Sequence, residues 1–361
     1  MNQPAEYVPA LSDLGNPRIS TVNHILEAYA PEIDRYIRKL LEGIDPVPKG
    51  MVEYHFGWVD QEFKPLNQSH GKRLRSTMCL LAFEAVHGDY QPCVPLAACI
   101  EMLHNFSLIH DDIEDGDEQR RGKPTVWKVW GIPLAINAGD LLHTLSYMAL
   151  TDLPVSAPFS TKRALEVYEA IFGTTIKLTQ GQHLDLEMEG SNDVSVETYL
   201  KMIYGKTASL IEGSTWAGAL FASDDQDLVN SYRAFGRNIG SAFQIRDDTL
   251  GVWGDPKITG KTGANDVMRK KKTYPILFGF ENASEKDRAQ LETIYARETV
   301  SREDARVVVE ILTRTGAYEH TQKLAQEYYQ KALDSLAATH IDDEPQRKLL
   351  EIGRFLVERN F

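Results

Sequence analysis

The sequence predicts an all-α protein. Apolar residues recur at helical spacing along most of the chain, whereas the alternating apolar and polar runs typical of strands are scarce. The 361 residues contain no internal repeat and no low-complexity segment. We therefore expect a single domain over residues 1–361, with a loosely packed tail at residues 1–17, where three prolines lie.

The expected helices follow one another closely along the chain. A stripe at i, i+4, i+7, i+8 and i+11 predicts the first helix, through Ile33, Ile37, Leu40, Leu41 and Ile44. The segment RSTMCLLAFEAVHGD predicts a second helix that stops at Gly88. The remaining helices are expected at about residues 94–115, 135–152, 162–188, 196–222, 225–251, 273–281, 284–298, 302–314 and 316–337.

Composition narrows the classes of partner and compartment. The net charge of −13 leaves no basic excess to neutralise a nucleic acid. The three cysteines are odd in number and lack the spacing of a metal site, which indicates a reduced, intracellular protein. The N-terminus does not resemble a secretion signal. No apolar run approaches the roughly 20 residues that span a bilayer, so we expect a cytoplasmic protein.

Four acids stand at the end of an apolar helix, in the segment CIEMLHNFSLIHDDIEDGDEQRRGKPT. Asp111 and Asp115 are four residues apart, so their carboxylates share one helix face and repel each other unless a cation bridges them. Hard oxygen ligands without cysteine suit Mg²⁺. From this segment alone, an exposed acidic helix end beside an unrelated basic loop remains an alternative.

A second acidic pair favours the metal site. FQIRDDTLGVWGD places Asp247 and Asp248 after another apolar helix, about 136 residues beyond the first pair. Two such pairs that face each other across a helical bundle would clamp metal ions between them.

Basic residues supply the counterpart. HGKRLRS places Lys72, Arg73 and Arg75 at a helix start, where arginine and lysine are suited to phosphate. Further basic sites are Arg120, Arg121, Lys206, Lys261 and Lys270–Lys272. Acids for a metal and bases for phosphate together indicate a ligand that carries a diphosphate.

The motifs GKRLR, LIHDDIEDGDEQRRGKPT, GQHLDL, GKTASLI, FQIRDDTLGVWGD and GKTGANDVMRKKKTYP occur in this order over about residues 70–280. In motif and spacing they closely resemble the trans-isoprenyl diphosphate synthases, the polyprenyl synthetase family. The resemblance implies an all-α bundle around a central cavity, usually in a homodimer. It also implies Mg²⁺-dependent joining of isopentenyl diphosphate to an allylic diphosphate, with about three ions per active site.

The resemblance assigns roles residue by residue. The metal-binding set would be Asp111, Asp115 and Asp247, with Asp112, Asp185 and Asp248 as further members. Isopentenyl diphosphate would be held by Lys72, Arg75, His104 and Arg121. The allylic site would contain Arg120, Lys206, Thr207, Gln244, Lys261 and Lys271, with Gln182 and Asp185 as a pair on the cavity wall. Lys206, Thr207 and Gln244 would also stabilise the carbocation formed when the allylic diphosphate departs.

Product length would depend on the residues four and five before the first aspartate, Ser107 and Phe106. An aromatic residue at the fifth position, with no insertion in the motif, resembles synthases that stop at geranylgeranyl diphosphate; farnesyl diphosphate is the alternative product. On an ideal helix Phe106 lies roughly 140° from Asp111, so this assignment depends on the resemblance. Phe106 as an ordinary core residue is the other interpretation.

The chain departs from the family pattern in three places. Gly251 stands at the final acidic position of the second motif, and His70 and Ser76 replace the usual glycine and proline around GKRLR. Because of Gly251, a non-catalytic subunit of a heteromeric synthase remains an alternative function for the protein.

Two further alternatives belong to other classes. A terpene cyclase would not need the isopentenyl site that Lys72, Arg75 and Arg121 imply. A di-iron carboxylate protein would use the Glu-x-x-His pairs at Glu84 and Glu101, but it leaves the basic motifs without a role.

Overall fold

The computed structural model describes residues 17–66, 71–153, 160–191, 193–254 and 264–358, and within them the protein is almost entirely helical. The all-α prediction is confirmed. The tail predicted at residues 1–17 and the allylic-site residue Lys261 lie outside the described residues, except for Pro17.

The helices of the first half are α1 (Pro17–Leu40), α2 (Pro46–Phe56), α3 (Leu74–His87), α4 (Val94–Glu114), α5 (Val126–Trp130), α6 (Ile132–Leu150), α8 (Thr161–Gly190), α9 (Val196–Ile203) and α10 (Ser209–Ala222). Those of the second half are α11 (Gln226–Trp253), α13 (Asn265–Met268), α14 (Tyr274–Asn282), α15 (Glu285–Tyr295), α16 (Arg302–Arg314), α17 (Ala317–Ala337) and α18 (Glu344–Glu358). A 3₁₀ turn, Gln91–Cys93, precedes α4. Two short strands, β1 (Gln119–Arg120) and β2 (Lys123–Pro124), form an antiparallel hairpin after α4.

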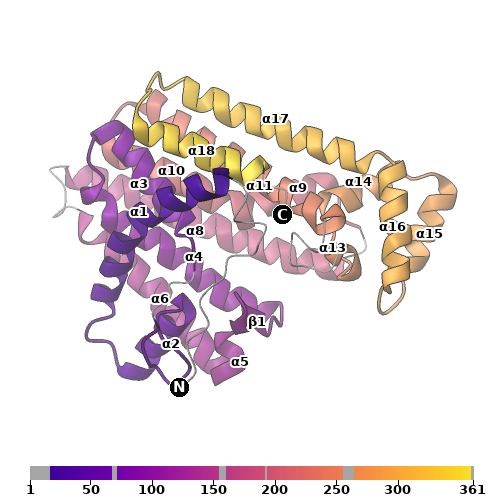
Figure 1. Cartoon of the computed structure of the whole chain (residues 1–361), viewed down its shortest axis with the longest axis horizontal. Coiled ribbons are helices and arrows are strands. Elements are labelled where there is room, and N and C mark those ends of the chain that lie inside the picture. The colour runs from indigo at the N-terminus through magenta and orange to yellow at the C-terminus, as the bar shows by residue number, and fades with distance from the viewer. Residues whose placement is uncertain (1–16, 67–70, 154–159, 192, 255–263, 359–361) are drawn as a thin grey trace.

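The helices form a bundle whose centre is α4. This helix packs against α6, α3 and α1, and most of its residues are buried. Helix α17 lies along α11 and reaches from the main bundle to the α15–α16 pair at the other end of the molecule (Figure 1). The second acidic motif therefore lies in α11, on a helix that the C-terminal half holds in place.

The helix that carries the first motif is unusually apolar. Residues Gln91–Glu114 are long and apolar enough to cross a membrane by composition alone, contrary to the sequence-based expectation. However, 78% of its most apolar window is buried inside the protein. The composition is therefore that of a central core helix.

The predicted helical stretch over 196–222 is confirmed in extent, but it contains an irregularity that matters for the site. The segment 196–222 is not a single helix, because a π-helical turn, Tyr204–Ala208, separates α9 from α10. A π-turn inserts one residue into the helix. Because almost every residue of α10 is buried, the apolar pattern shows no stripe whose shift would reveal the insertion. The C-terminal helix α18 was also not expected.

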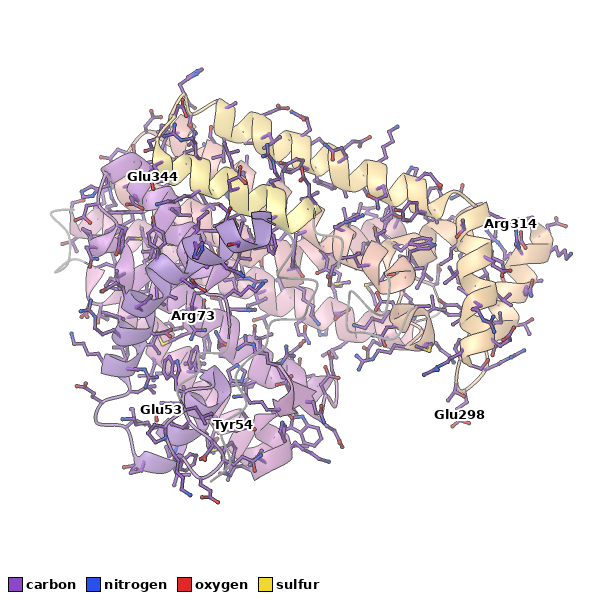
Figure 2. The ribbon with its side chains drawn as sticks, viewed as in Figure 1. Glu53, Tyr54, Arg73, Glu298, Arg314 and Glu344 are labelled. Atoms are coloured by element: carbon purple, nitrogen blue, oxygen red, sulfur yellow. The ribbon has the colours of Figure 1, made fainter. Side chains whose placement is uncertain are left out.

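A buried arginine of the GKRLR motif connects three helices. Arg73 has a left-handed backbone (φ 49°), and its side chain lies in the interior of the bundle (Figure 2). Its Nε lies 2.6 Å from Asp34 of α1 and one terminal nitrogen lies 3.4 Å from Glu101 of α4. Ser76, at the position where the family has proline, donates a hydrogen bond to Glu101. These contacts fix the start of α3 between Lys72 and Arg75.

Candidate active site

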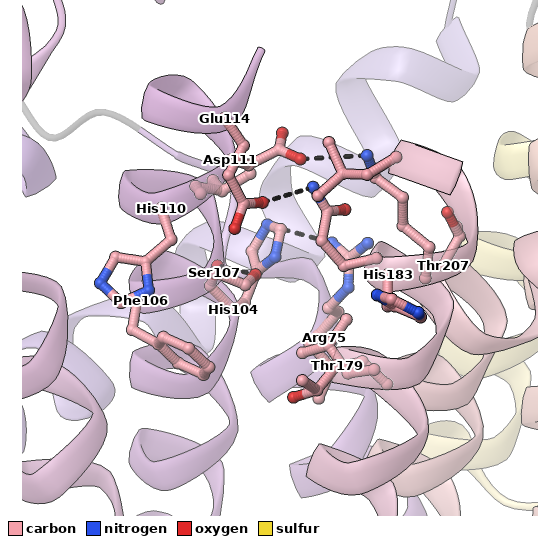
Figure 3. Close-up of a pocket in the computed structure, with 16 residues that line it drawn as sticks. Arg75, His104, Phe106, Ser107, His110, Asp111, Glu114, Thr179, His183 and Thr207 are labelled. Atoms are coloured by element: carbon pink, nitrogen blue, oxygen red, sulfur yellow. Dashed lines mark hydrogen bonds and ion pairs between the residues drawn. The ribbon is translucent and has the colours of Figure 1, made fainter. Parts of the chain in front are cut away.

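A cavity of about 350 Å³ lies between α4, α8 and the π-turn. Several predicted site residues line it: Arg75, His104, Phe106, Ser107, Asp111, Gln182, Lys206 and Thr207. Figure 3 shows Asp111 and Thr207 on opposite walls, with Arg75 and His104 between them. The structure thus brings together residues that are far apart in the sequence.

Lys206 connects two of the predicted metal-binding acids. Its Nζ lies 3.0 Å from Asp111 Oδ1 and 2.6 Å from Asp185 Oδ2. Partial burial acts to lower the pKa of Lys206, but the two carboxylates outweigh it and raise the pKa above its usual value. Lys206 is therefore a charged ammonium at the head of the cavity, as its predicted role at a diphosphate requires.

Arg120 lies on the other side of the first acidic motif. It donates through Nε to Asp112 Oδ1 at 2.5 Å, and a terminal nitrogen lies 3.6 Å from Asp111 Oδ2. Burial and the neighbouring charge of Asp111 raise the pKa of Asp112 to about 6, although Arg120 opposes the shift. Partial desolvation and Asp111 likewise raise the pKa of Asp115 to about 6. Burial is the main cause of both raised pKa values, and repulsion from Asp111 adds to it.

A chain of hydrogen bonds joins the π-turn to the second motif. Thr207 Oγ1 donates to Gln244 Oε1 at 2.9 Å, and Gln244 Nε2 donates to Asp248 Oδ1 at 3.0 Å. Tyr199 donates to the other oxygen of Asp248, which is only 3% exposed. Burial raises the pKa of Asp248 to about 7. Asp247, its neighbour, is partly exposed on α11.

The missing acid of the second motif has a counterpart elsewhere in the chain. A Cβ placed on Gly251 would overlap the carboxylate of Asp266, the second residue of α13. Asp266 also lies close enough to Asp248 to raise its pKa, after the larger effect of burial. An acid from a different segment thus occupies the space beside Gly251. Sequence reasoning missed Asp266, although the motif GKTGANDVMRKKKTYP contains it.

Two residues of the predicted isopentenyl site, Arg75 and His104, line the cavity. Arg75 and His104 are hydrogen-bonded at 3.2 Å between Arg75 Nη1 and His104 Nε2 (Figure 3). Burial, Arg75 and Arg121 lower the pKa of His104 well below its usual value, so the imidazole is neutral. Its Nε2 therefore accepts from Arg75, which leaves Nδ1 as a donor. Lys72 Nζ lies 5.4 Å from the ring centre of Phe355 in α18.

Two other predicted allylic-site residues are near the first motif. Gln182 of α8 donates to Glu114 of α4 at 2.7 Å, across the rim of the cavity. Lys271 is exposed, and its charge acts to lower the pKa of Asp115, which places it on the same side.

Phe106 lines the cavity and packs against a residue that the sequence did not single out. Its ring stacks on His143 of α6, with ring centres 4.4 Å apart and planes 25° apart. His143 is in turn hydrogen-bonded to Tyr147 at 3.1 Å. Phe106 thus lines the cavity from α4 and is backed by aromatic side chains of α6.

Glu101, one of the acids considered for a di-iron site, has other contacts. Its oxygens accept hydrogen bonds from Arg73, Ser76 and Asn105. Glu84 accepts one from Tyr29. Both carboxylates thus have partners in the protein.

Comparison with known proteins agrees with this geometry. The family model described as polyprenyl synthetase matches residues 57–312. The (2E,6E)-farnesyl diphosphate synthase of Mycobacterium tuberculosis is 34% identical over 326 residues, which cover 90% of this chain and 89% of the relative. The geranylgeranyl diphosphate synthase of the same organism is also 34% identical, over 313 residues that cover 86% and 88% of the two chains.

A solved structure gives the same result for the fold. The crystal structure of geranylgeranyl pyrophosphate synthetase from Pyrococcus horikoshii superposes with a TM-score of 0.84 at 33% identity, covering 94% of this chain and 99% of the other. Relatives that share both the sequence and the fold over nearly the whole chain are prenyl diphosphate synthases. The chain therefore belongs to the polyprenyl synthetase family and is a trans-prenyltransferase.

Proposed function

We propose that the protein is a Mg²⁺-dependent geranylgeranyl diphosphate synthase, which extends allylic diphosphates with isopentenyl diphosphate. One observation carries the proposal. The cavity has a charged head, where Lys206 joins Asp111 and Asp185, and an aromatic residue, Phe106, in its wall. A diphosphate fits the head, and a growing hydrocarbon chain fits the remainder. The family supports the type of reaction. The cavity supports the orientation of the substrate, with its diphosphate at the head and its hydrocarbon chain in the remainder.

Positive side chains at the head hold the allylic diphosphate. Lys206 and Arg120 are already held beside Asp111 by ion pairs, so little side-chain freedom is lost when an anion arrives. Lys271 and Lys261 belong to the same proposed group. As the allylic C–O bond breaks, the electron pair stays with the diphosphate, and these cations stabilise the charge that develops on its oxygens.

The opposite charge develops on the allylic carbon. Thr207 donates its hydroxyl proton to Gln244, so the lone pairs of Thr207 Oγ1 remain for the cation. Asp248 holds the Gln244 amide in this orientation. We therefore assign Asp248 to positioning Gln244, and Asp247 to the metal. Apolar residues along the cavity wall, Leu178, Leu186 and Leu210, exclude water that would trap the cation.

The acids at the head of the cavity fit Mg²⁺. Asp111 is close enough to Asp115 to contribute to its raised pKa, after burial, and the ammonium of Lys206 already lies between Asp111 and Asp185. No three acids, histidines or cysteines form a preassembled cluster within the described residues, which suits an ion that completes its shell with phosphate and water. When bound, Mg²⁺ neutralises the leaving diphosphate. Asp247 would supply the ligand from α11.

Isopentenyl diphosphate binds on the other side. Arg75, Lys72 and Arg121 provide positive charge, and the Nδ1–H of neutral His104 provides a directed donor. The double bond then attacks the cation, and the proton lost from isopentenyl diphosphate passes to the released diphosphate. The reaction needs no nucleophilic serine or cysteine.

The length of the product is set by the aromatic residue in the cavity wall. Phe106 lines the cavity, and His143 stacks on the Phe106 ring from α6 and supports it. A supported ring at this position favours a product of fixed length, and the aromatic residue favours geranylgeranyl diphosphate over farnesyl diphosphate.

An exposed apolar surface supports a homodimer. On α6 and α8, large apolar side chains are 41–59% exposed: Ile132, Leu134, Ile136, Met148, Leu165, Phe172 and Ile176. The two helices are adjacent, because the rings of Tyr147 and Phe172 lie 4.9 Å apart. A patch of this extent is typical of a protein interface. We propose that a second copy of the chain covers it.

The state of the cysteines bears on the compartment of the protein. Cys79, Cys93 and Cys99 are free thiols, although the sulfurs of Cys79 and Cys93 lie 3.7 Å apart. Free thiols support a reducing, cytoplasmic compartment.

Asp266 beside Gly251 weakens the argument for an inactive subunit, since the second motif keeps a third nearby acid.

Incubation with isopentenyl diphosphate, Mg²⁺ and each of three primers (dimethylallyl, geranyl and farnesyl diphosphate) tests the proposal. Mass analysis of the products should find geranylgeranyl diphosphate as the longest main product with every primer. Farnesyl diphosphate as the end product would refute the length assignment only. Absence of any elongation would support the non-catalytic subunit.

A further inference from the structure

The π-turn is anchored on the side away from the cavity by a buried acid. Glu212, in the first turn of α10, is 1% exposed and lies outside the cavity wall. It accepts hydrogen bonds from Arg233 Nε at 2.8 Å and from Arg237 Nε at 2.9 Å, both on α11. Lys177 of α8 lies 3.5 Å away. One carboxylate thus ties together α8, α10 and α11.

The link from this acid to the π-turn is Tyr204. Its hydroxyl donates to Glu212 Oε2 at 2.7 Å and accepts from Lys177 Nζ at 3.1 Å, so both of its hydrogen-bonding functions are used. The guanidinium of Arg237 lies 5.5 Å from the centre of the Tyr204 ring. The backbone of Tyr204 is held as well, because its carbonyl accepts from the Ser209 N–H, the five-residue bond of a π-turn.

Tyr204 begins the five-residue turn that also contains Lys206 and Thr207. Those two side chains face the cavity, where they contact Asp111, Asp185 and Gln244 (Figure 3). If the π-turn became a regular α-helix, the residues after it would be rotated by roughly 100° about the helix axis. The direction of Lys206 and Thr207 therefore depends on keeping the π-turn, and the anchor at Tyr204 is the contact that keeps its first residue in place.

We infer that Tyr204 and Glu212 are positioning residues for the allylic half of the active site, acting through the π-turn on Lys206 and Thr207. Neither touches the substrate. Because the inference rests on the proposed function, its test needs a wild-type enzyme that condenses the two substrates. The isopentenyl side, with Arg75 and His104 on α3 and α4, does not depend on the π-turn.

Tyr204→Phe tests the inference, because it removes only the hydroxyl. We expect kcat to fall and the KM for the allylic substrate to rise, each on the order of tenfold, since a small misplacement of catalytic groups is costly. The KM for isopentenyl diphosphate should stay within about twofold. The affinity for a non-reactive thiodiphosphate analogue of the allylic substrate, measured by calorimetry, should fall in parallel.

Tyr232→Phe is the matched control. Tyr232 is fully buried on α11 and donates to Gln346 at 2.8 Å, so this variant also loses one buried hydroxyl but lies outside the cavity wall. Its kinetic constants should match the wild type even if its melting temperature falls.

Glu212→Gln provides a second, independent measurement. Both residues act through one contact. The double variant Tyr204→Phe/Glu212→Gln should therefore be no less active than the less active of the two single variants. Equal changes of both KM values, or wild-type kinetics in Tyr204→Phe, would overturn the inference while leaving the proposed function intact. A wild-type chain without condensation activity would instead overturn the proposed function.

Discussion

At the scale of single residues, Phe106 separates product length from catalysis. Phe106→Ala removes one ring from the cavity wall while His143 remains on α6. We expect products longer by at least one five-carbon unit, with little change in the rate of the first condensation. Mass analysis after incubation with farnesyl diphosphate and isopentenyl diphosphate measures this.

The control for Phe106 lies three residues along the same helix. Ile109 is 1% exposed and is not part of the cavity wall. Ile109→Ala should lower stability, by about 2–5 kcal/mol, and leave the product unchanged. If Phe106→Ala yields the wild-type product, Phe106 is an ordinary core residue.

Gly251 gives a prediction opposite to the one from the motif alone. Restoring the family acid with Gly251→Asp should lower activity, because the new side chain would overlap Asp266 and add a like charge beside it. Asp266→Ala alone should also lower activity. The double variant, which moves the acid from position 266 to 251, should recover part of the loss.

Steady-state kinetics with a melting curve for each Gly251 and Asp266 variant distinguishes an effect at the site from unfolding. A Gly251→Asp protein more active than the wild type would show that the motif is simply incomplete and that Asp266 does not occupy the place of the missing acid.

At the scale of helices, the site depends on a close approach between α8 and the π-turn. A Cβ on Gly181 would overlap the backbone of Gly205 and Lys206. Gly181→Ala should therefore push α8 away from the π-turn and separate Asp185 from Lys206. We expect kcat/KM to fall on the order of 100-fold, since contacts in the site are displaced by a backbone shift.

Gly173 on the same helix is the matched control, because a Cβ there meets nothing within 4 Å. Gly173→Ala should stabilise the protein by about 0.5–1 kcal/mol, the usual gain of alanine over glycine in a helix, without changing activity. Similar kinetics for Gly181→Ala and Gly173→Ala would contradict the packing argument.

The helices also show where sequence reasoning succeeds and where it stops. Apolar periodicity places α4 within one residue and α16 to the residue, because buried stripes repeat regularly. The π-turn leaves no such trace, because α10 is buried at almost every position and has no apolar stripe whose shift could be seen. Asp266 and His143 were missed for another reason: only the packing of α13 and α6 brings them beside Gly251 and Phe106, which lie in other segments of the sequence.

At the scale of the whole molecule, the apolar patch on α6 and α8 predicts the oligomeric state. Ile176 is 59% exposed, so Ile176→Glu should cost little in the monomer but place a charge in the interface. We expect this variant to sediment as a monomer at concentrations where the wild type is a dimer. Tyr318→Glu, at an exposed residue of α17 outside the patch, should leave the dimer intact.

A wild-type protein that sediments as a monomer would contradict the homodimer. The patch would then need another occupant, and the regulatory-subunit alternative would gain support.

The central claim is that acids from two distant helices act together in one ionisation-and-condensation reaction. The most direct measurement is incorporation of labelled isopentenyl diphosphate into an allylic primer with Mg²⁺, by the wild type, Asp111→Ala and Asp247→Ala. We predict robust incorporation by the wild type and a loss on the order of 1,000-fold in each variant, as expected when groups that stabilise the transition state are removed. Near-normal turnover in both folded variants would contradict the account.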